Sequence, residues 1–266
     1  MDKVKISIFF ILLILGQTAS AACKPLKIQR SLSNTSWGWE YSKEQVLAGQ
    51  RSQRFEVRPG DCHGDIKWND CAMNRERSEI SVTDPRFLPG SQTAISLNIY
   101  LPKDFKDSNK VRTTLAQIHS RGGPKGTAGG LPAKPPLIQF DLFSGNFKMC
   151  WHRLSGKDGD IKDECVWHDL TTLDQMVGRW TKLNFEFNTD LQKGSARVWI
   201  NDQQKVNIQH PLVNYRPEHF FFKYGIYRSF VTRHGGPLPT QIAFFDEIKI
   251  ANTIEEIEKS CTKTVD

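Results

Sequence analysis

Two polar side chains in the segment 115–119 have the spacing that a strand requires to present them together. Gln117 and His119 are two positions apart, and alternate side chains of a β-strand point to the same face. Strict alternation adds Leu115 to that face. An amide and an imidazole side by side on an open sheet could bind a substrate and remove a proton from it.

Two further segments repeat this arrangement. In the first, Arg75, Arg77 and Glu79 occupy alternate positions, and in the second Lys223 and Tyr227 fall on one face. Each segment therefore offers polar groups to a common sheet surface, among neighbours typical of strands.

The three segments resemble the Arg-Ser/Thr-Glu-Leu, Gln-Ile/Val-His and Tyr-Phe-Lys-Ala-Gly-x-Tyr motifs of jelly-roll alginate lyases. The stretch Arg51–Glu79 is more similar to the related heparin-lyase-I-like and glucuronan-lyase group, and the resemblance extends from about residue 51 to residue 250. Ile80 stands where the motif has Leu, Phe221 where it has Tyr, and Tyr224 where it has Ala. The last two differences would change the floor of the cleft and hence the substrate.

This resemblance implies β-elimination on a 4-linked uronate polymer. The C-5 proton becomes acidic when the neighbouring carboxylate is neutralised, and Arg77 and Gln117 are suited to bind that carboxylate. His119 is the candidate base, because an imidazole has an ordinary pKa of roughly 6.5, and Tyr227 is the candidate acid. Where proton and leaving group lie on the same side, Tyr227 could perform both transfers, if Lys223 or Arg77 lowers its pKa from roughly 10.

Three basic residues are the candidates for substrate binding, namely Lys223, Arg75 and Arg121. Arg121 opens the loop 120–136, which holds five Gly and four Pro. A loop of this length inside a compact domain is often functional, and its basic residues suit a lid over a polyanion. An ordinary solvated loop is the alternative. Glu79 is expected to orient Arg77 rather than to react.

Residues 1–22 have the features of a secretory signal peptide. Lysines precede an apolar run over residues 6–15, and small residues follow it. The run is shorter than the roughly 20 residues that a membrane span requires. We therefore expect a secreted or periplasmic protein that has no membrane association after cleavage, with residues 23–266 forming one polysaccharide lyase jelly-roll domain.

Six cysteines in an exported chain are expected to form disulfides. Sequence alone cannot choose among the possible pairings, but proximity favours a bridge around a Gly-containing loop and another across a hairpin, which leaves the two terminal cysteines to each other. The predicted bridges are Cys62–Cys71, Cys150–Cys165 and Cys23–Cys261.

Nothing in the sequence indicates a catalytic metal or another required cofactor. No Cys-x-x-Cys pair is present, and no cysteine has a histidine at a zinc-finger interval. Asp246, near the end of the last predicted strand, could bind a structural calcium ion as some relatives do. The end of a capped strand is the simpler interpretation.

Short alternating segments separated by turns predict an all-β protein with the architecture of a two-sheet β-jelly roll, a concanavalin-like sandwich. Only residues 253–260 have a helical pattern. The motif strands are then expected to be neighbours on the concave sheet, and we expect a monomer.

The formal net charge of +7 favours an acidic partner. Nucleic acid is not expected, because zinc-finger spacing, a basic helix and RNA-binding aromatic motifs are all lacking. A glycoside hydrolase would require two carboxylates flanking the bond, and Glu79 has no evident partner. The sequence thus predicts an acidic-polysaccharide lyase, with endo cleavage favoured, and leaves open whether the polymer is alginate, glucuronan or a glycosaminoglycan. A non-catalytic, lectin-like binder is the alternative.

Overall fold

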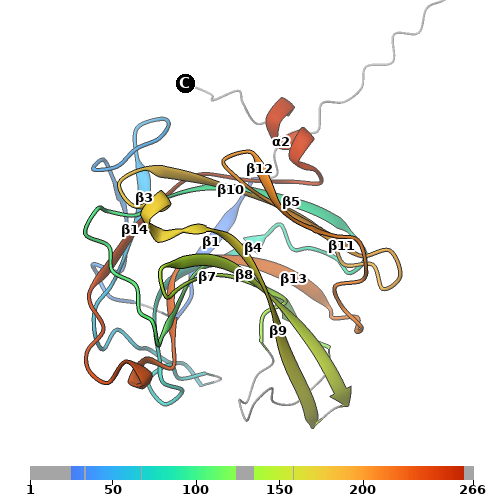
Figure 1. Ribbon diagram of the computed structural model, residues 1–266, viewed down its shortest axis with the longest axis horizontal. Coiled ribbons are helices and arrows are strands. Elements are labelled where there is room, and N and C mark those ends of the chain that lie inside the picture. Colours follow the sequence, from blue (N-terminus) through green and yellow to red (C-terminus); the bar gives the residue numbers. More distant parts are fainter. Residues whose placement is uncertain (1–24, 33, 67, 124–134, 158, 261–266) are drawn as a thin grey trace, which may run out of the picture.

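A computed structural model describes residues 25–32, 34–66, 68–123, 135–157 and 159–260. Two antiparallel seven-stranded sheets pack face to face (Figure 1), which confirms the predicted jelly roll. The helical segments described are α1 (Leu173–Met176), α2 (Ile254–Ser260) and a 3-10 turn at Val231–His234. No helix in the ranges given above combines the length and apolarity needed to cross a membrane.

One sheet, called here the groove sheet, has the strand order β1-β4-β13-β6-β7-β8-β9. It brings the three motif segments onto the adjacent strands β4, β13 and β6, as expected. At one edge, β8 and β9 form a long hairpin that projects beyond the body of the sandwich (Figure 1). The strands are β1 (Lys27–Arg30), β4 (Arg75–Asp84), β6 (Arg112–Arg121), β7 (Ile138–Phe143), β8 (Asn146–Lys157), β9 (Asp160–Thr172) and β13 (His219–Ser229).

The second sheet, called the outer sheet, has the order β12-β11-β10-β5-β14-β3-β2. Its strands are β2 (Trp39–Ser42), β3 (Ser52–Val57), β5 (Gln92–Tyr100), β10 (Trp180–Asn188), β11 (Ser195–Ile200), β12 (Gln203–Ile208) and β14 (Gln241–Ala251).

The core lies between the sheets and is built from alternate residues of each strand. In β13, Phe220, Phe222, Tyr224 and Ile226 are buried in it, whereas Phe221, Lys223 and Tyr227 belong to the opposite face. Full burial of each such side chain contributes on the order of 1.5–3 kcal/mol. A register slip of one residue would exchange the two faces, so burial fixes the register of the groove.

Alternation fails at one point of β6. Leu115 was expected to share the face of Gln117, but it is fully buried in the core together with its neighbour Ala116. A register shift between Thr114 and Ala116 allows two consecutive residues to face inward. Thr114 consequently lies on the same groove face as Gln117. The two residues are three positions apart, whereas regular alternation would require an even separation.

Tyr224 does not form part of the cleft floor, contrary to the expectation from its departure from the motif. Its ring is 1% exposed inside the core, where it packs edge-on against Phe55, and its hydroxyl donates to Gln53 Oε1 at 2.9 Å. Gly225 follows with φ of +131°, and a Cβ there would lie 2.5 Å from the Ser78 carbonyl oxygen. The tight approach of β13 to β4 therefore requires glycine at this position.

Two of the predicted disulfides are present. Cys62 and Cys71 close a loop before β4, and Cys150 joins Cys165 across the β8–β9 hairpin. The third predicted bridge, Cys23–Cys261, and the predicted signal segment 1–22 lie outside the described residues.

Candidate active site

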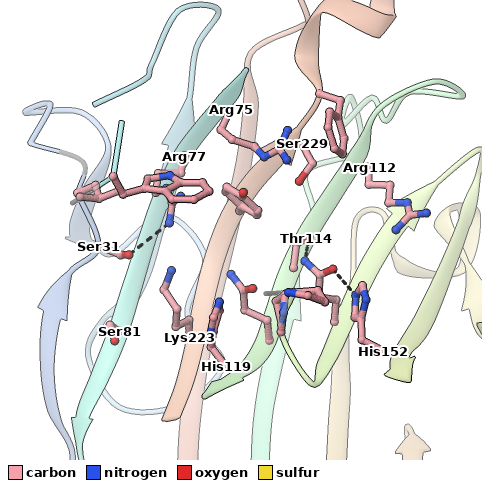
Figure 2. Close-up of a pocket in the computed structure, with 18 of the residues that line it drawn as sticks. Ser31, Arg75, Arg77, Ser81, Arg112, Thr114, His119, His152, Lys223 and Ser229 are labelled. Atoms are coloured by element: carbon pink, nitrogen blue, oxygen red, sulfur yellow. Dashed lines mark hydrogen bonds between the residues drawn. The ribbon is translucent and has the colours of Figure 1, made fainter. Parts of the chain in front are cut away.

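A cavity of about 900 Å³ runs over the groove sheet, on the face away from the core. All seven residues proposed from sequence as catalytic or substrate-binding contribute to its lining. Figure 2 shows four of them, Arg75, Arg77, His119 and Lys223, projecting from neighbouring strands into one space. The seven are Arg75, Arg77, Gln117, His119, Arg121, Lys223 and Tyr227.

Strand register arranges these side chains in rows across the sheet. Lys223 of β13 is opposite Gln117 of β6, and Tyr227 is opposite Arg77 of β4 on one side and Thr114 on the other. Tyr227 and Lys223 thus share one face, as the sequence predicted. Facing side chains of paired strands are roughly 5 Å apart at Cβ, so each row can form direct contacts.

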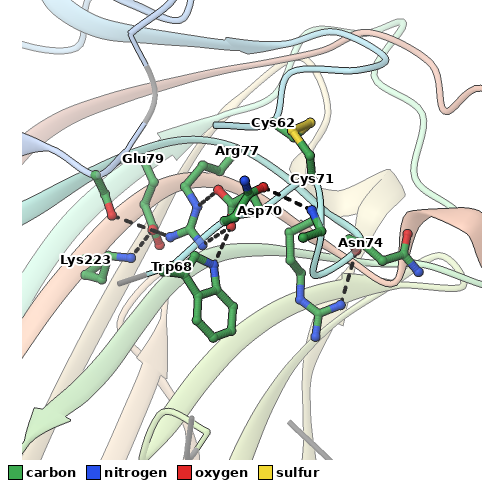
Figure 3. Close-up of polar contacts among 12 residues, drawn as sticks. Cys62, Trp68, Asp70, Cys71, Asn74, Arg77, Glu79 and Lys223 are labelled. Carbon is green, nitrogen blue, oxygen red and sulfur yellow. Dashed lines mark hydrogen bonds and ion pairs between the residues drawn. A yellow bond between two sulfur atoms is a disulfide. The ribbon is translucent and has the colours of Figure 1, made fainter. Parts of the chain in front are cut away.

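Glu79 is the central acceptor of the site (Figure 3). Gln117 Nε2 and Lys223 Nζ both donate to its carboxylate, and Arg77 Nη1 lies 3.2 Å from Oε2. Burial alone would raise the pKa of Glu79, but Lys223 and then Arg77 outweigh burial and hold the pKa below its ordinary value. Glu79 is therefore an anion that holds three donors in place.

Lys223 has the opposite electrostatic balance. Burial lowers the pKa of its ammonium group, although Glu79 favours the charged form. An ammonium group has three N–H donors and one carboxylate oxygen cannot take all of them. Lys223 therefore retains hydrogens for a ligand in the cavity that it lines.

Arg77 is clamped by a second carboxylate, which sequence reasoning missed. Its Nε and Nη2 lie 2.5 and 2.6 Å from the two oxygens of Asp70, a fully buried residue (Figure 3). Burial would lower the pKa of Arg77, but Glu79 and Asp70 raise it above its usual range. An arginine can bind both oxygens of one carboxylate at once. In Arg77 this bidentate contact is made with Asp70, and not left free for a substrate carboxylate.

The Cys62–Cys71 loop supplies this clamp. Asp70 N donates to His63 O at 2.8 Å, and Arg75 N donates to Asp70 O at 2.8 Å, so the loop is joined to the start of β4. Trp68 Nε1 donates to Asp70 Oδ1 at 2.7 Å, and its side chain lines the cavity. The sequence signal was the position of Asp70, one residue before a bridged cysteine and a few residues before the motif arginine.

Tyr227 lies with its ring against Arg77, whose Cζ is 4.5 Å from the ring centroid. Burial raises the pKa of the phenol, against the opposing effects of Arg77 and Arg75. The hydroxyl is therefore protonated at neutral pH, a state that can donate a proton.

His119 stacks on Phe221 of the adjacent strand, with ring centroids 5.5 Å apart and an interplanar angle of 19°. Its Nδ1 lies 2.9 Å from Ser120 N and 3.2 Å from Ser120 O. These contacts fix the ring at the end of the groove opposite Tyr227, with the Gln117–Lys223 row between them.

A chain of polar groups from β6 to β9 adjoins the site, and all of its members except Asp163 are buried. His152 Nδ1 lies 2.8 Å from Asp163 and its Nε2 lies 2.8 Å from Gln139 Oε1. Gln139 in turn contacts Thr114, which donates to Asp141 at 2.6 Å. His152 lines the cavity.

The cavity lining is strongly basic. Among the described residues it contains eight lysines and arginines but only two carboxylates, Asp65 and Asp163. Arg121 is exposed at the rim, and residues 124–134 of the predicted lid lie outside the described ranges. A polyanion is therefore the electrostatic complement of the groove.

Two places in the described part of the chain carry side chains of the kind that bind metal ions. Within the described ranges, Cys150, His152 and Cys165 form the one group of three His, Cys, Asp or Glu side chains close enough to hold an ion, but its two sulfurs are bonded to each other. Asp246 Oδ2 accepts hydrogen bonds from Leu47 N at 2.8 Å and Ala48 N at 3.1 Å. Asp246 thus joins β14 to the turn before β3, as expected of a capping carboxylate.

Comparison with solved structures gives several matches to the same fold. An endo-β-1,4-glucuronan lyase from the fungus Trichoderma reesei superposes with a TM-score of 0.63 at 15% identity, covering 86% of this chain and 98% of that chain. Alginate lyase A1-II′ gives 0.52 at 16% identity, covering 83% and 85%. The cellulose induced protein Cip1 gives 0.50 at 14% identity, covering 86% and 91%. At these identities the likeness shows the fold alone.

Comparison of sequences identifies the family. No curated protein matches the chain. The profile of the family described as polysaccharide lyase, however, matches residues 24–249, which is most of the chain. The chain therefore belongs to the polysaccharide lyase family.

Proposed function

We propose that this lyase cleaves a 4-linked, uronate-containing polysaccharide by β-elimination, within the polymer chain. One observation carries the proposal. The anion Glu79 holds Gln117 and Lys223 as donors in a basic groove, between a histidine and a protonated tyrosine. This is a combination that binds a carboxylate, removes a proton beside it and protonates a leaving oxygen.

Gln117 and Lys223 are the proposed ligands of the uronate carboxylate. Each donates to Glu79 and each has a further N–H to offer. Their hydrogen bonds would neutralise the carboxylate and stabilise the negative charge that develops when the C-5 proton leaves. In this scheme Arg77 does not bind the substrate carboxylate, because its guanidinium is already bonded to Asp70 and Glu79. It provides a fixed positive charge beside the Tyr227 ring.

His119 is the proposed base and Tyr227 the proposed acid. When Nδ1 carries the proton and points to Ser120 O at 3.2 Å, the lone pair for proton abstraction is on Nε2. When Nδ1 instead accepts from Ser120 N at 2.9 Å, Nε2 carries the proton, and the ring must change tautomer before it can act as the base. Burial raises the pKa of Tyr227, which favours donation to the departing O-4 and disfavours the alternative in which the phenolate is also the base. The proposed reaction uses side chains alone and needs no cofactor. A structural calcium ion at Asp246 stays a prediction.

A panel of acidic polysaccharides tests this function. Purified protein is incubated with glucuronan, alginate and several glycosaminoglycans, and the unsaturated product is followed by ultraviolet absorbance. We expect absorbance to rise on at least one polymer, with a rapid fall in chain length that marks endo cleavage. Tight binding without unsaturated product on any polymer would favour the lectin-like alternative.

Export is part of the proposal. The predicted signal at residues 1–22 and two disulfides in the described part of the chain support an oxidising compartment, secreted or periplasmic. N-terminal sequencing of protein recovered from the medium or periplasm should begin near residue 23. Recovery of a chain that still begins at residue 1 would contradict export by cleavage.

A further inference from the structure

Two arginines flank Ser229 on the groove face, beyond the row that contains Tyr227. Ser229 is opposite Arg75 on β4 and opposite Arg112 on β6. All three residues line the cavity, and Figure 2 shows both arginines near Ser229 at one end of it. Ser229 is two residues past Tyr227, which corresponds to about 7 Å along a strand.

Neither arginine has a carboxylate partner in the described part of the chain. Arg75 is only 3% exposed, its Nη1 donates to Asn74 O at 3.2 Å, and its Nε is buried without a hydrogen-bond acceptor. Arg112 lies over the Trp167 ring at 4.5 Å and forms no ion pair, although it is near enough to Asp141 to favour that carboxylate.

Other buried arginines of this protein are paired. Arg77 contacts Asp70 and Glu79, and Arg228 contacts Glu76 at 2.5 Å. A buried charge without a counter-ion is costly, because the protein interior replaces its hydration poorly. Arg75 is thus the exception among these arginines, and its side chain lines the cavity that an anion would enter.

The backbone around Phe230 holds this end of the groove in place. Phe230 has φ of +59°, which is unfavourable for an aromatic residue, and Asn74 has φ of +62°. Phe230 N donates to Asn74 O at 2.9 Å, and Thr232 N donates to Asn74 Oδ1 at 3.0 Å.

The Phe230 ring consequently lies between two guanidinium groups. The Cζ of Arg75 is 3.8 Å from its centroid and that of Arg233 is 4.1 Å from it. Stacking on aromatic rings orients guanidinium groups without neutralising them. The fold therefore gathers positive charge at this end while leaving it available to a ligand.

We propose that Arg75, Ser229 and Arg112 form an oxyanion subsite that binds a second acidic group of the polysaccharide, beside the sugar at which the chain is cleaved. This proposal rests on the proposed function. Two guanidinium groups and a hydroxyl match a carboxylate or a sulfate ester, both of which present paired oxygens. The substrate class is therefore a polymer with closely spaced acidic groups.

Thermal unfolding in inorganic sulfate tests the subsite without any turnover. Wild type, Arg75→Gln, Arg112→Gln and the double variant are melted in sodium sulfate and in sodium chloride of equal ionic strength. A ligand of the folded state raises Tm, so wild type should gain more from sulfate than the double variant does. Arg197→Gln is the matched control, because Arg197 also lies over a tryptophan but is paired with Glu186 on the outer sheet.

An equal gain from sulfate in wild type and in the double variant would overturn the subsite, since general salt effects act on both. Should Arg75→Gln not fold, Arg112→Gln and Ser229→Ala still carry the test, because both remove partly exposed groups. Loss of the gain in these variants, with the gain kept in Arg197→Gln, supports the subsite.

Substrate comparison then distinguishes the two acidic groups. Glucuronan offers carboxylates alone, whereas heparin adds sulfates that chemical desulfation removes. Loss of a hydrogen bond to a charged group should lower kcat/KM on the order of 10- to 100-fold in Arg112→Gln. A loss on glucuronan assigns the subsite to a carboxylate, a loss confined to sulfated heparin assigns it to a sulfate, and no loss on any cleaved polymer overturns the subsite. If wild type cleaves no polymer but the sulfate effect on Tm is lost in the double variant, the proposed function fails and the subsite stands.

Discussion

Arg77 donates through Nε and Nη2 to both carboxylate oxygens of Asp70, at 2.5 and 2.6 Å. This buried pair joins the Cys62–Cys71 loop to strand β4, which also carries Glu79. It also keeps the guanidinium fixed against the Tyr227 ring. The motif arginine thus organises the site from within the protein.

Asp70→Asn is expected to destabilise the protein. The substitution keeps the shape of the side chain but leaves a buried guanidinium short of one counter-ion, a loss that typically costs about 3–5 kcal/mol. Denaturant unfolding measures the change. The control is Asp202→Asn, because its pair with Lys182 is exposed and such pairs contribute less than about 1 kcal/mol. Similar losses in the two variants would show that the Asp70 contact is not a stabilising clamp.

Tyr227→Phe is expected to abolish turnover while binding persists. Phenylalanine keeps the ring beside Arg77 but cannot protonate the leaving O-4, and general acid catalysis contributes about 10²–10⁴-fold. The rate of unsaturated-product formation and the Kd for oligouronides are measured together. Tyr41→Phe, an exposed position of the outer sheet, is the control. Near-normal product formation in Tyr227→Phe would remove this residue from the mechanism.

His119→Gln should lower kcat by a similar factor of about 10²–10⁴ if the imidazole is the base. The variant should also lack the increase of kcat/KM that we expect of wild type between about pH 5 and 8, the range in which an ordinary imidazole deprotonates. His168→Gln is the control, since His168 is on β9 and is not among the cavity-lining residues of the described chain. A small loss with an unchanged pH profile would assign proton abstraction to Tyr227 instead.

Asp141→Asn is expected to stabilise the protein increasingly as pH rises. Asp141 is fully buried, and burial raises the pKa of its carboxyl despite the hydrogen bond from Thr114. Above the ordinary carboxyl pKa of about 3.9, the unfolded chain ionises before the folded one, so wild-type stability falls until the pH passes the folded pKa. Asparagine has no such titration.

Unfolding free energies of wild type and Asp141→Asn, measured from pH 4 to pH 8, test this sign. Groups that do not interact with Asp141 titrate equally in both proteins, so the difference reports on Asp141 together with its neighbour His152. Asp169→Asn, at an exposed pair with Lys148, provides the reference without burial. A difference that does not grow with pH would mean that Asp141 is ionised at no cost in the folded protein.

Salt should lower the reaction rate at low substrate concentration. The groove presents eight basic side chains, and exposed charges are screened within about 10 Å at 0.1 M salt. We expect kcat/KM on a uronate polymer to fall from low to high ionic strength, with kcat affected less. An unchanged kcat/KM across this range of ionic strength would show that the basic lining does not contribute to substrate capture.

Alternation of side chains was sufficient to predict the motif strands, because each has one face in the core and one in the groove. Burial then fixed the order of residues on β13, where Lys223 and Tyr227 share a face as expected. Leu115 was assigned to the wrong face because a register shift is a property of two paired strands, and a single strand contains no sign of it.

Features that depend on tertiary packing could not be predicted from the sequence. The role of Asp70 depends on how a loop folds back onto β4, and that of Arg112 depends on which strand is adjacent to β13. Strand β9 was not predicted from the sequence, because the acidic segment Asp160–Glu164 has the composition of a solvated turn. Pairing with β8 and the Cys150–Cys165 bridge support it as a strand.

The acidic character of β9 has a consequence for association between copies of the protein. β9 is a terminal strand of the groove sheet, so one row of its backbone N–H and C=O groups is available for pairing with another chain. Lys162, Asp163 and Glu164 are exposed along it. Charged side chains along an open edge disfavour pairing with another sheet, because such pairing would remove part of their hydration. The charged edge thereby protects the protein from aggregating through its longest strand.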